Sequence, residues 1–496
     1  MSGVSGPGTA SFRDPAGTLI SDPASTKPYL LRAVHPAYVD GIRTLLSSSF
    51  LRELMEEGTV VETRETADPA RALEDHGLGA PTGTPTDSPA DSAPEWIRRA
   101  LVLEHERVPF PSYPEEWPPE MLHAAGALTL EICRRALEEG YILKDATPRN
   151  VLFRGSDPVF VDLPSFEEPA EGDPVWRAHA QFVETFLLPL MASRDLCLPM
   201  AAHFAGPGEG IEPVRMARML PLRKLLRPAT LGLVTLPALL TPSGHRLRAQ
   251  GRKGPRFDRE VAREVLLRHI RKLEKRLERL RPSVGGGPSR WEGYQDACHY
   301  PEEAWAAKLE AVERVAARLS PATALDLGCN EGEFSAVVAR AGASVVAVDA
   351  DEGVVGRTWR RARDGGLEIL PLVVDLADPT PPAGWRNRER PSFLRRSRGR
   401  FDGILALAVV HHLLVTHRVP LDEILALIRE LARDFALVEY VPPDDPRFRA
   451  LAWGREELFQ DLTLEAFLEA LGRTGTVEET IELPGSQRRL VLVRYG

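Results

Sequence analysis

The sequence predicts an α/β fold for residues 288–496 and a separate α+β unit before it. Two apolar runs that each end in an acid, Leu325-Asp326 and Val348-Asp349, flank a glycine-bearing turn and a segment that can form a helix. From residue 301 onward, strand-like and helix-like segments alternate, as in sheets that are mostly parallel. The stretch 282–288, Pro-Ser-Val-Gly-Gly-Gly-Pro, breaks the chain, and we place the main domain boundary there.

Length and composition limit the classes of protein that fit. A chain of 496 residues is too long for one core, and 43% hydrophobic with 27% charged residues is typical of soluble globular proteins. The net charge of −9 argues against bulk affinity for nucleic acid. The four cysteines lie far apart in the sequence, at Cys133, Cys197, Cys298 and Cys329. We therefore expect no disulfide scaffold, no metal site and a cytoplasmic location.

No membrane partner is expected either. The N-terminal residues 1–10 are rich in Gly, Ser and Pro and lack the apolar core of a signal peptide, so they are predicted to be flexible. The most apolar later run, 231–240, is too short to span a bilayer.

Elements of the N-terminal half follow from residue type and spacing. Residues 67–94 contain almost no large apolar side chains and are predicted to be a flexible insertion, neither strand nor helix. A strand is predicted over 98–110, and a long amphipathic helix over 119–140, which ends at a glycine.

A second long helix is predicted over 257–281. Its apolar residues recur four and three apart, and most intervening positions hold Arg, Lys or Glu; the apolar seam is Leu266, Ile270, Leu273, Leu277 and Leu280. We assign 241–287 to this basic helix and a Gly/Pro linker. Two interpretations remain open, a brace between the domains or a basic surface that docks a polyanion.

The C-terminal elements alternate in a regular order. A helix over 301–319 precedes five predicted strands, at 324–327, 344–348, 368–374, 401–407 and 435–440. Helices are predicted between strands, including one over 421–432, and a last helix over 463–471 precedes two runs, 477–483 and 489–494, that form a hairpin.

The turn after the first strand carries the most specific motif. It is not G-x-G-x-x-G and has no Lys-Ser/Thr, so neither a dinucleotide nor a phosphate-cradling loop is favoured. It resembles the first motif of class I S-adenosylmethionine-dependent methyltransferases, with Asn330 in place of the middle glycine. Asn is the other residue that best tolerates left-handed dihedral angles. The resemblance covers 291–496 and implies a Rossmann-like seven-stranded sheet whose final strand is antiparallel. An ordinary βαβ unit without a ligand is the alternative.

The same resemblance assigns the methyl-donor site. Asp326, Gly328, Asn330 and Gly332 would lie under the methionine part and the sulfonium of S-adenosylmethionine. Asp349 would hold the ribose hydroxyls, and Asp375 would contact the adenine amino group. Each acid could instead cap a helix or form a turn, but ligands of such sheets bind where the strands end.

Two histidines follow the fourth strand. His411 or His412 could act as general base toward an acceptor O or N atom, or one of them could pack beneath the next helix. The loop 385–400 carries seven arginines and two aromatics, which either contact the acceptor or are solvated. We expect the acceptor between His411 and this loop. We expect a small molecule rather than a nucleic acid, and the sequence does not identify it.

A second constellation lies in the N-terminal half. Asp145 is followed five residues later by Asn150, then by a strand ending in Asp162. This resembles the catalytic loop and metal-binding acid of protein and small-molecule kinases, H-R-D-x-x-x-x-N and D-F-G. The resemblance implies an α+β kinase-like domain over 11–240, with Asp145 as base and with Asn150 and Asp162 holding the Mg²⁺ of ATP.

Several kinase features are missing. No G-x-G-x-x-G is present near the start, and Arg32 stands where a kinase has its lysine, with Glu53 or Glu56 as its expected partner. This half is therefore either one part of a bifunctional kinase-methyltransferase or a pseudokinase module that binds a nucleotide or polyanion. The joined halves resemble a bacterial family of methyltransferases, some linked to nodulation. The oligomeric state is not indicated.

Overall fold

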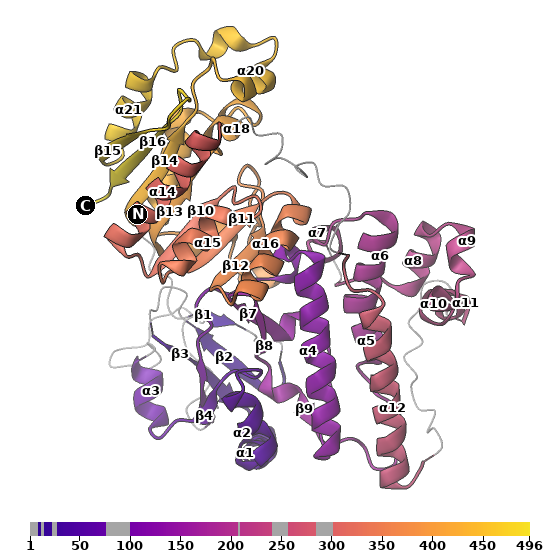
Figure 1. The fold of residues 1–496 in the computed structure, drawn as a ribbon. Coiled ribbons are helices and arrows are strands. Elements are labelled where there is room, and N and C mark those ends of the chain that lie inside the picture. The colour runs from indigo at the N-terminus through magenta and orange to yellow at the C-terminus, as the bar shows by residue number, and fades with distance from the viewer. Residues whose placement is uncertain are drawn as a thin grey trace.

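The computed structural model describes residues 8–10, 14–21, 27–75, 100–206, 209–240, 256–283 and 301–496. Figure 1 shows the C-terminal half, coloured orange to yellow, lying against one end of the indigo-to-magenta N-terminal half. The predicted boundary at 282–288 falls mostly outside the described residues, as do residues 241–255 and 288–300 of the predicted segments.

A seven-stranded sheet organises the C-terminal half, in the order β12-β11-β10-β13-β14-β16-β15. Its strands are β10 (Thr323–Leu327), β11 (Ser344–Asp349), β12 (Ile369–Val373), β13 (Phe401–Ala406), β14 (Ala432–Tyr440), β15 (Thr476–Glu482) and β16 (Arg489–Arg494). The first five pair in parallel, and β16 runs antiparallel to both of its neighbours. The predicted Rossmann-like sheet with an antiparallel final strand is confirmed.

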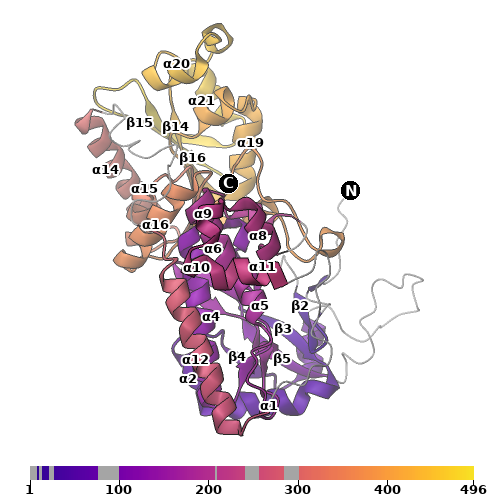
Figure 2. The same ribbon diagram turned by 90° about the vertical axis from the view of Figure 1, so that its right-hand side faces the viewer.

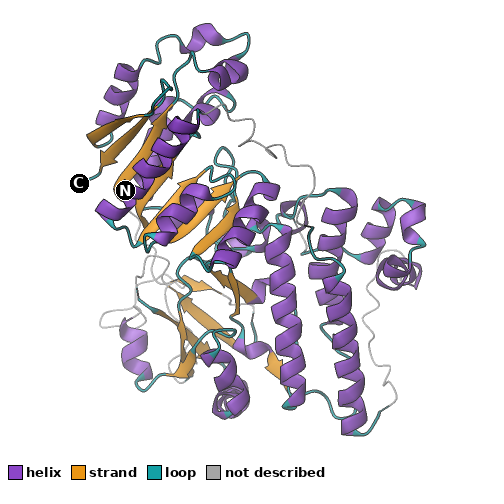
Figure 3. Cartoon of the chain, viewed as in Figure 1, coloured by secondary structure: helices purple, strands orange, loops and turns teal. Residues whose placement is uncertain are grey.

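Both faces of this sheet are covered, because successive strand residues point to opposite sides. On β10, Ala324 packs with α14 and α15, and Leu325 joins the core on the face covered by α19 and α21. Figure 3 shows helices on either side of the orange strands. The helices are α14 (Glu302–Leu319), α15 (Glu333–Arg340), α16 (Glu352–Gly365), α17 (Phe393–Ser397), α18 (Val410–Val415), α19 (Leu421–Leu431), α20 (Pro446–Ala452) and α21 (Leu464–Gly472).

The N-terminal half begins with a five-stranded antiparallel sheet, in the order β1-β2-β3-β5-β4. Its strands are β1 (Gly8–Ala10), β2 (Gly17–Ser21), β3 (Tyr29–Val34), β4 (Thr63–Glu65) and β5 (Leu101–Glu106), and helices α1 (Val39–Ser47) and α2 (Ser49–Glu56) connect β3 to β4.

Two predictions of flexibility are wrong in part. Residues 8–10 form β1, because their backbone groups pair with those of β2. Residues 69–75 form the helix α3 (Pro69–Asp75), whose Ala72 and Leu73 are buried against Ile20 and Leu31. The predicted lack of helix is therefore wrong for 69–75, where these two consecutive apolar residues are buried. Residues 1–7 and 76–94 lie outside the described part of the chain.

The rest of this half is mainly helical, with two small antiparallel pairs, β7 (Val151–Arg154) with β8 (Asp157–Phe160) and β6 (Ile142–Leu143) with β9 (Phe166–Glu167). The helices are α4 (Pro119–Glu138), α5 (His179–Phe182), α6 (Leu188–Leu196), α7 (Ala201–Phe204), α8 (Pro213–Met219), α9 (Leu222–Leu225), α10 (Pro228–Thr230), α11 (Leu236–Leu240) and α12 (Arg259–Glu278).

The long helix α12 belongs to this half. It lies along α4 (Figure 2), and all five residues of its predicted apolar seam are buried. The His123 ring of α4 hydrogen-bonds the Leu277 carbonyl at 3.2 Å. The predicted seam is therefore confirmed, and it packs along α4 of the N-terminal half.

The two halves meet at two places. At the first, Arg396 of α17 pairs with Glu116, and its guanidinium lies 5.1 Å from the Phe110 ring and 4.9 Å from the Tyr113 ring. Arg390 adds a contact to Glu115 at 3.3 Å. Arg390 and Arg396 of the loop 385–400 therefore hold the N-terminal half, which the sequence did not predict, whereas Arg386, Arg388, Arg395 and Arg398 are exposed, as the solvated alternative expects.

The second junction involves α16. Arg360 pairs with Glu120 of α4 at 2.6 Å, and the Trp359 indole donates to the Ser156 carbonyl at 3.1 Å. Glu352, at the start of the same helix, accepts a bond from the Met200 backbone N–H at 2.8 Å. Burial raises the pKa of Glu352 to about 7. The helix that follows the end of β11 is thus fixed to the N-terminal half along its length.

The Arg396–Glu116 pair yields a stability prediction. Replacing Arg396 by Ala leaves the fully buried Glu116 carboxylate without its cation, so the free energy of unfolding should fall by about 3–5 kcal/mol. The matched control is Arg398→Ala, two residues away, where a side chain that is 70% exposed pairs with Glu430. That change should cost under about 1 kcal/mol. Equal losses in urea denaturation of the two variants would contradict the assignment.

Candidate active site

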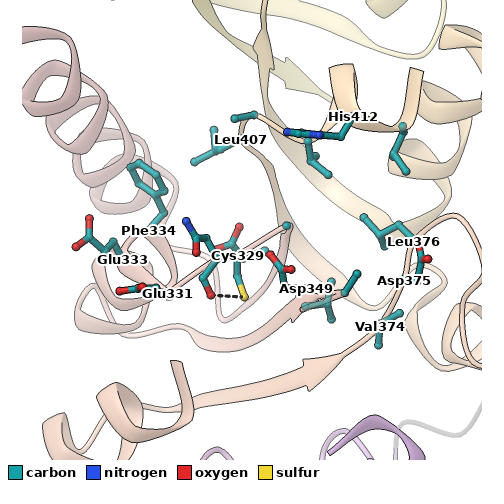
Figure 4. A pocket seen from close by; sticks show the side chains of 18 of the residues that line it. Cys329, Glu331, Glu333, Phe334, Asp349, Val374, Asp375, Leu376, Leu407 and His412 are labelled. Atoms are coloured by element: carbon teal, nitrogen blue, oxygen red, sulfur yellow. Dashed lines mark hydrogen bonds between the residues drawn. The ribbon is translucent and has the colours of Figure 1, made fainter. Parts of the chain in front are cut away.

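A crevice of about 500 Å³ opens at the carboxyl ends of β10, β11, β12 and β13. Figure 4 shows its lining side chains converging from the turn after β10, from α15 and from the start of α18. The volume is in the range of small-molecule sites, and the ends of parallel strands are where ligands of such sheets bind.

The turn after β10 depends on left-handed backbone. Gly328 has φ of +74°, Asn330 +48° and Gly332 +72°, so the expectation that Asn330 tolerates such angles is confirmed. A Cβ added to Gly328 would lie 3.1 Å from a Val409 methyl group, and one added to Gly332 would lie 2.5 Å from a Thr358 methyl group. Gly328 and Asn330 line the crevice, whereas Gly332 packs behind the turn.

Asp349 ties this turn to the end of β11. Its carboxylate accepts bonds from the backbone N–H groups of Asn330 and Asp351, each at 3.0 Å. Burial raises the pKa of Asp349, and the two backbone donors oppose that shift. Asn330 Oδ1 is buried with no hydrogen-bond partner within the described ranges.

The other two acids play different parts. Asp326 is 2% exposed and accepts a bond from the Ser335 hydroxyl at 2.6 Å, and burial raises its pKa to about 6. It lines the floor of the crevice and holds the start of α15. Asp375 is exposed at the rim, where its Oδ1 accepts a bond from the Ala377 N–H at 2.9 Å. The turn-forming alternative for Asp375 therefore applies, although the residue also lines the crevice.

The two adjacent histidines lie in different surroundings. His412 lines the crevice and lies across its opening from Cys329 and Asp349 (Figure 4). His411 is 3% exposed, does not line the crevice, and stacks against Phe448. The prediction of His411 as a base is wrong, and so is an acceptor between His411 and the loop 385–400, because neither reaches the crevice. The packing alternative holds for His411.

Burial also changes the chemistry of both histidines. It lowers the pKa of His411 well below the ordinary value. The pKa of His412 falls to about 4, mainly by burial and further through the nearby His417, Arg488 and Arg447. The assumption that a histidine here titrates near neutrality is therefore corrected. At neutral pH the His412 ring is uncharged.

Sequence reasoning missed Lys308 on α14. Its side chain is 2% exposed, and its ammonium lies 2.6 Å from Glu439 and 4.7 Å from the centre of the Phe334 ring, at the wall of the crevice. The sequence does indicate that Lys308 is buried, because it lies on the same helical face as the apolar Ala304 and Val312. A lysine on a predicted buried face needs a buried carboxylate.

The kinase-like residues gather in a second cluster. Arg32 lies 2.9 Å from Asp14 and 3.6 Å from Asp162. The Ser165 hydroxyl donates to Asp162 Oδ2 at 2.5 Å and accepts from the Asn150 amide at 3.1 Å.

Two further residues bear on the kinase comparison. Burial, followed by the charge of Asp162, raises the pKa of Asp145. The predicted partners of Arg32 are wrong: Arg32 pairs with Asp14 and Asp162, and Glu53 points to Arg135 instead. Among the residues described by the structure, no group of three or more His, Cys, Asp or Glu is arranged to hold a metal ion.

With this geometry in place, comparison with known proteins identifies the family. The chain is 30% identical over 481 residues to the nodulation protein NoeA of Rhizobium meliloti (strain 1021), covering 97% of this chain and 94% of that protein. The chain belongs to the NoeA family. Residues 298–472 also match the family described as "Methyltransferase domain". The NoeA-family chain therefore carries a methyltransferase domain in its C-terminal half.

Solved structures resemble part of the chain. The N-methyltransferase NodS from Bradyrhizobium japonicum WM9 is 16% identical, with 38% of this chain and 96% of that chain covered and a TM-score of 0.29. The bifunctional kinase-methyltransferase WbdD is 18% identical, with 38% and 39% covered and a TM-score of 0.28. At these values neither structure bears on the substrate of the NoeA-family chain.

A titration tests the environment of His412. Burial and neighbouring cations disfavour its charged form, so its NMR signals should stay those of a neutral ring from pH 8 to about pH 5, with a midpoint near pH 4. The unfolded chain binds this proton near pH 6.5, so the native state should lose stability as the pH falls from about 6.5 to about 4. His412→Gln assigns the signal. A midpoint near 6.5 in the folded protein would refute the buried environment.

Proposed function

We propose that this protein transfers a methyl group from S-adenosylmethionine to an O or N atom of a small acceptor. The supporting observation is the crevice at the ends of β10 and β11, which is lined by a left-handed turn and by the carboxylate of Asp349. S-adenosylmethionine supplies an electrophilic methyl group on a sulfonium. The family match to a methyltransferase domain supports the same reaction class.

The chemistry of the residues around the crevice suits S-adenosylmethionine. The absent side chain at Gly328 lets Val409 pack closely against the turn, and both residues line the crevice. Asp349 uses one bond per oxygen on the backbone, so each oxygen keeps a lone pair for a ribose hydroxyl. Asp326 would support the turn from below, and Asp375 would meet the adenine amino group from the rim.

Methyl transfer to such an acceptor rests mainly on alignment. Proximity and orientation can contribute about 7–11 kcal/mol when the reacting atoms are held in line. His412 faces the opening opposite the donor turn and is neutral, so it can accept a hydrogen bond from an acceptor hydroxyl or amine and orient its lone pair. A pKa of about 4 makes it a weak base, which favours orientation over full proton removal.

The acceptor end of the crevice is largely apolar. Its wall near His412 is formed by Leu407, Val409, Leu413 and Leu451, with Thr416 and His417 as the polar neighbours. This composition suits a small molecule with an apolar portion beside its nucleophilic atom. The arginine loop 385–400 does not line this crevice, and its Arg396 lies at the domain junction.

For the N-terminal half we propose a kinase-like fold without phosphotransfer. The strand order β1-β2-β3-β5-β4, the helices between β3 and β4, and the Asp145–Asn150 spacing support the kinase-like part. The ion network argues against phosphotransfer. Both oxygens of Asp162 are engaged, one near Arg32 and one by Ser165, where a kinase needs them for Mg²⁺.

Donor binding tests the methyltransferase proposal. Asp349→Ala should lower the affinity for S-adenosylmethionine in calorimetry at least tenfold, or about 1.4 kcal/mol, because hydrogen bonds to a charged group are lost. Asp364→Ala, an exposed acid on α16, is the control and should leave the affinity unchanged. Equal affinities of wild type and Asp349→Ala would remove the ribose role, and no binding to wild type would remove the donor.

Phosphotransfer is tested separately. Full-length protein with Mg²⁺ and ATP should show no hydrolysis or transfer above that of Asp162→Ala, because the carboxylate is already neutralised within the fold. Magnesium-dependent turnover that Asp162→Ala abolishes would instead establish the bifunctional alternative.

A further inference from the structure

Exposed leucines concentrate in one part of the N-terminal half. Within the described residues, seven leucines rank as exposed large hydrophobics, and six of them fall between residues 222 and 240. Four are more than three-quarters exposed, namely Leu222 (82%), Leu226 (77%), Leu239 (76%) and Leu240 (79%). We call the segment α8 to α11, residues 213–240, the leucine–arginine face. Scattered surface leucines need no explanation, but a cluster does.

These leucines belong to well-packed helices. The π-helical turn η7 (Leu231–Thr235) joins α10 to α11, and its Leu233 and Val234 are buried in the core. The Thr235 hydroxyl donates to the Leu225 carbonyl at 2.7 Å, which fastens this helix to α9. The segment is therefore apolar on two sides, one facing the protein and one facing outward. A surface helix of a globular protein normally has one apolar side only.

All charged residues of the same segment are basic. Residues 213–240 contain no Asp or Glu, although the whole chain has a net charge of −9. Their basic residues are Arg215, Arg218, Arg223, Lys224 and Arg227. The four arginines are exposed, whereas Lys224 is committed to Asp195 at 3.4 Å. In the order Leu222-Arg223-Lys224-Leu225-Leu226-Arg227, the exposed Leu222 and Leu226 are interspersed with the exposed Arg223 and Arg227.

The position suits contact with a large flat surface. Figures 1 and 2 show α8 to α11 at the outer edge of the N-terminal half, next to α6 and α12. The crevice lies in the other half of the molecule, so a surface bound here leaves it open. In the described ranges no helix combines the length and hydropathy required to cross a bilayer. A short, basic and leucine-rich element is instead suited to lie within the interfacial layer.

We propose that the leucine–arginine face docks the protein on the surface of a membrane that contains anionic lipids. The leucines would enter the boundary between headgroups and acyl chains, and the arginines would contact the lipid phosphates. Of the residues that protein interfaces enrich, this segment contains arginines and methionines but no Tyr, Trp or Phe. The proposal replaces the expectation of no membrane partner. It concerns a bound surface, with no segment that crosses the bilayer.

The test is flotation of the full-length protein with vesicles, without methyl donor, so that its outcome does not depend on the proposed enzymatic activity. Wild type should bind vesicles of phosphatidylcholine and phosphatidylglycerol at least tenfold more tightly than pure phosphatidylcholine vesicles, and added salt should weaken the binding. The quadruple variant Leu222→Ser, Leu226→Ser, Leu239→Ser, Leu240→Ser should lose at least tenfold in partitioning, because buried apolar area is removed. All four side chains are exposed, so the fold should persist.

Matched controls separate this surface from general properties of the chain. Leu458→Ser removes a leucine that is 73% exposed in the other half and should leave binding unchanged. Arg223→Glu with Arg227→Glu should weaken binding to anionic vesicles at least tenfold, whereas Arg52→Glu with Arg340→Glu, two exposed arginines elsewhere, should change it less than threefold.

Two results would overturn the proposal. One is wild-type binding to anionic vesicles that is absent or equal to that of the quadruple variant. The other is self-association of the wild type in sedimentation, lost in the quadruple variant, without vesicle binding. That second result would assign the leucine–arginine face to a second copy of the chain.

Discussion

The buried pair of Arg396 and Glu116 constrains how the two halves of this protein can be arranged. Both side chains are removed from water, and a desolvated charge is tolerated only beside its counter-charge. The aromatic rings of Phe110 and Tyr113 enclose the guanidinium and exclude other arrangements of the loop. A small relative rotation of the halves would leave two unpaired charges in an apolar setting, so this junction has few acceptable geometries.

That constraint extends to the crevice through α16. The helix begins just after Asp349 and is held on its outer side by the contacts of Glu352, Trp359 and Arg360 with the N-terminal half. In the turn after β10, the Asn330 N–H donates a hydrogen bond to the Asp349 carboxylate. The crevice is therefore shaped from two directions, by local backbone constraints in the turn and by the junction behind it.

Local features were predictable from the sequence, and contacts between distant segments were not. Strand and helix positions from 301 onward follow from apolar periodicity, and the left-handed turn follows from Gly328 and Asn330. The role of Arg396 was hidden because its partner lies 280 residues earlier in the chain. A run of arginines in a loop has the same pattern whether it meets solvent, a phosphate or a buried glutamate.

The histidines illustrate a finer limit. His411 and His412 are neighbours, and near the start of α18 a difference of one residue turns a side chain by about 100° (3.6 residues per turn). One ring therefore reaches the crevice and the other does not, and only the exact start of the helix decides which. The prediction for residues 69–75 was wrong for another reason. Their composition is typical of a loop, but Ala72 and Leu73 are buried in the core.

One continuous cluster of buried side chains runs from Trp117 and Phe110 in the first half, through Phe393 and Phe401, to Val491 in the last strand. The chain has two sequence modules but, in this cluster, one hydrophobic interior. Separating the modules would cut through packed aromatic rings and expose them to water. The two modules therefore share one hydrophobic interior, so a substitution at the junction in one module changes the packing of residues in the other.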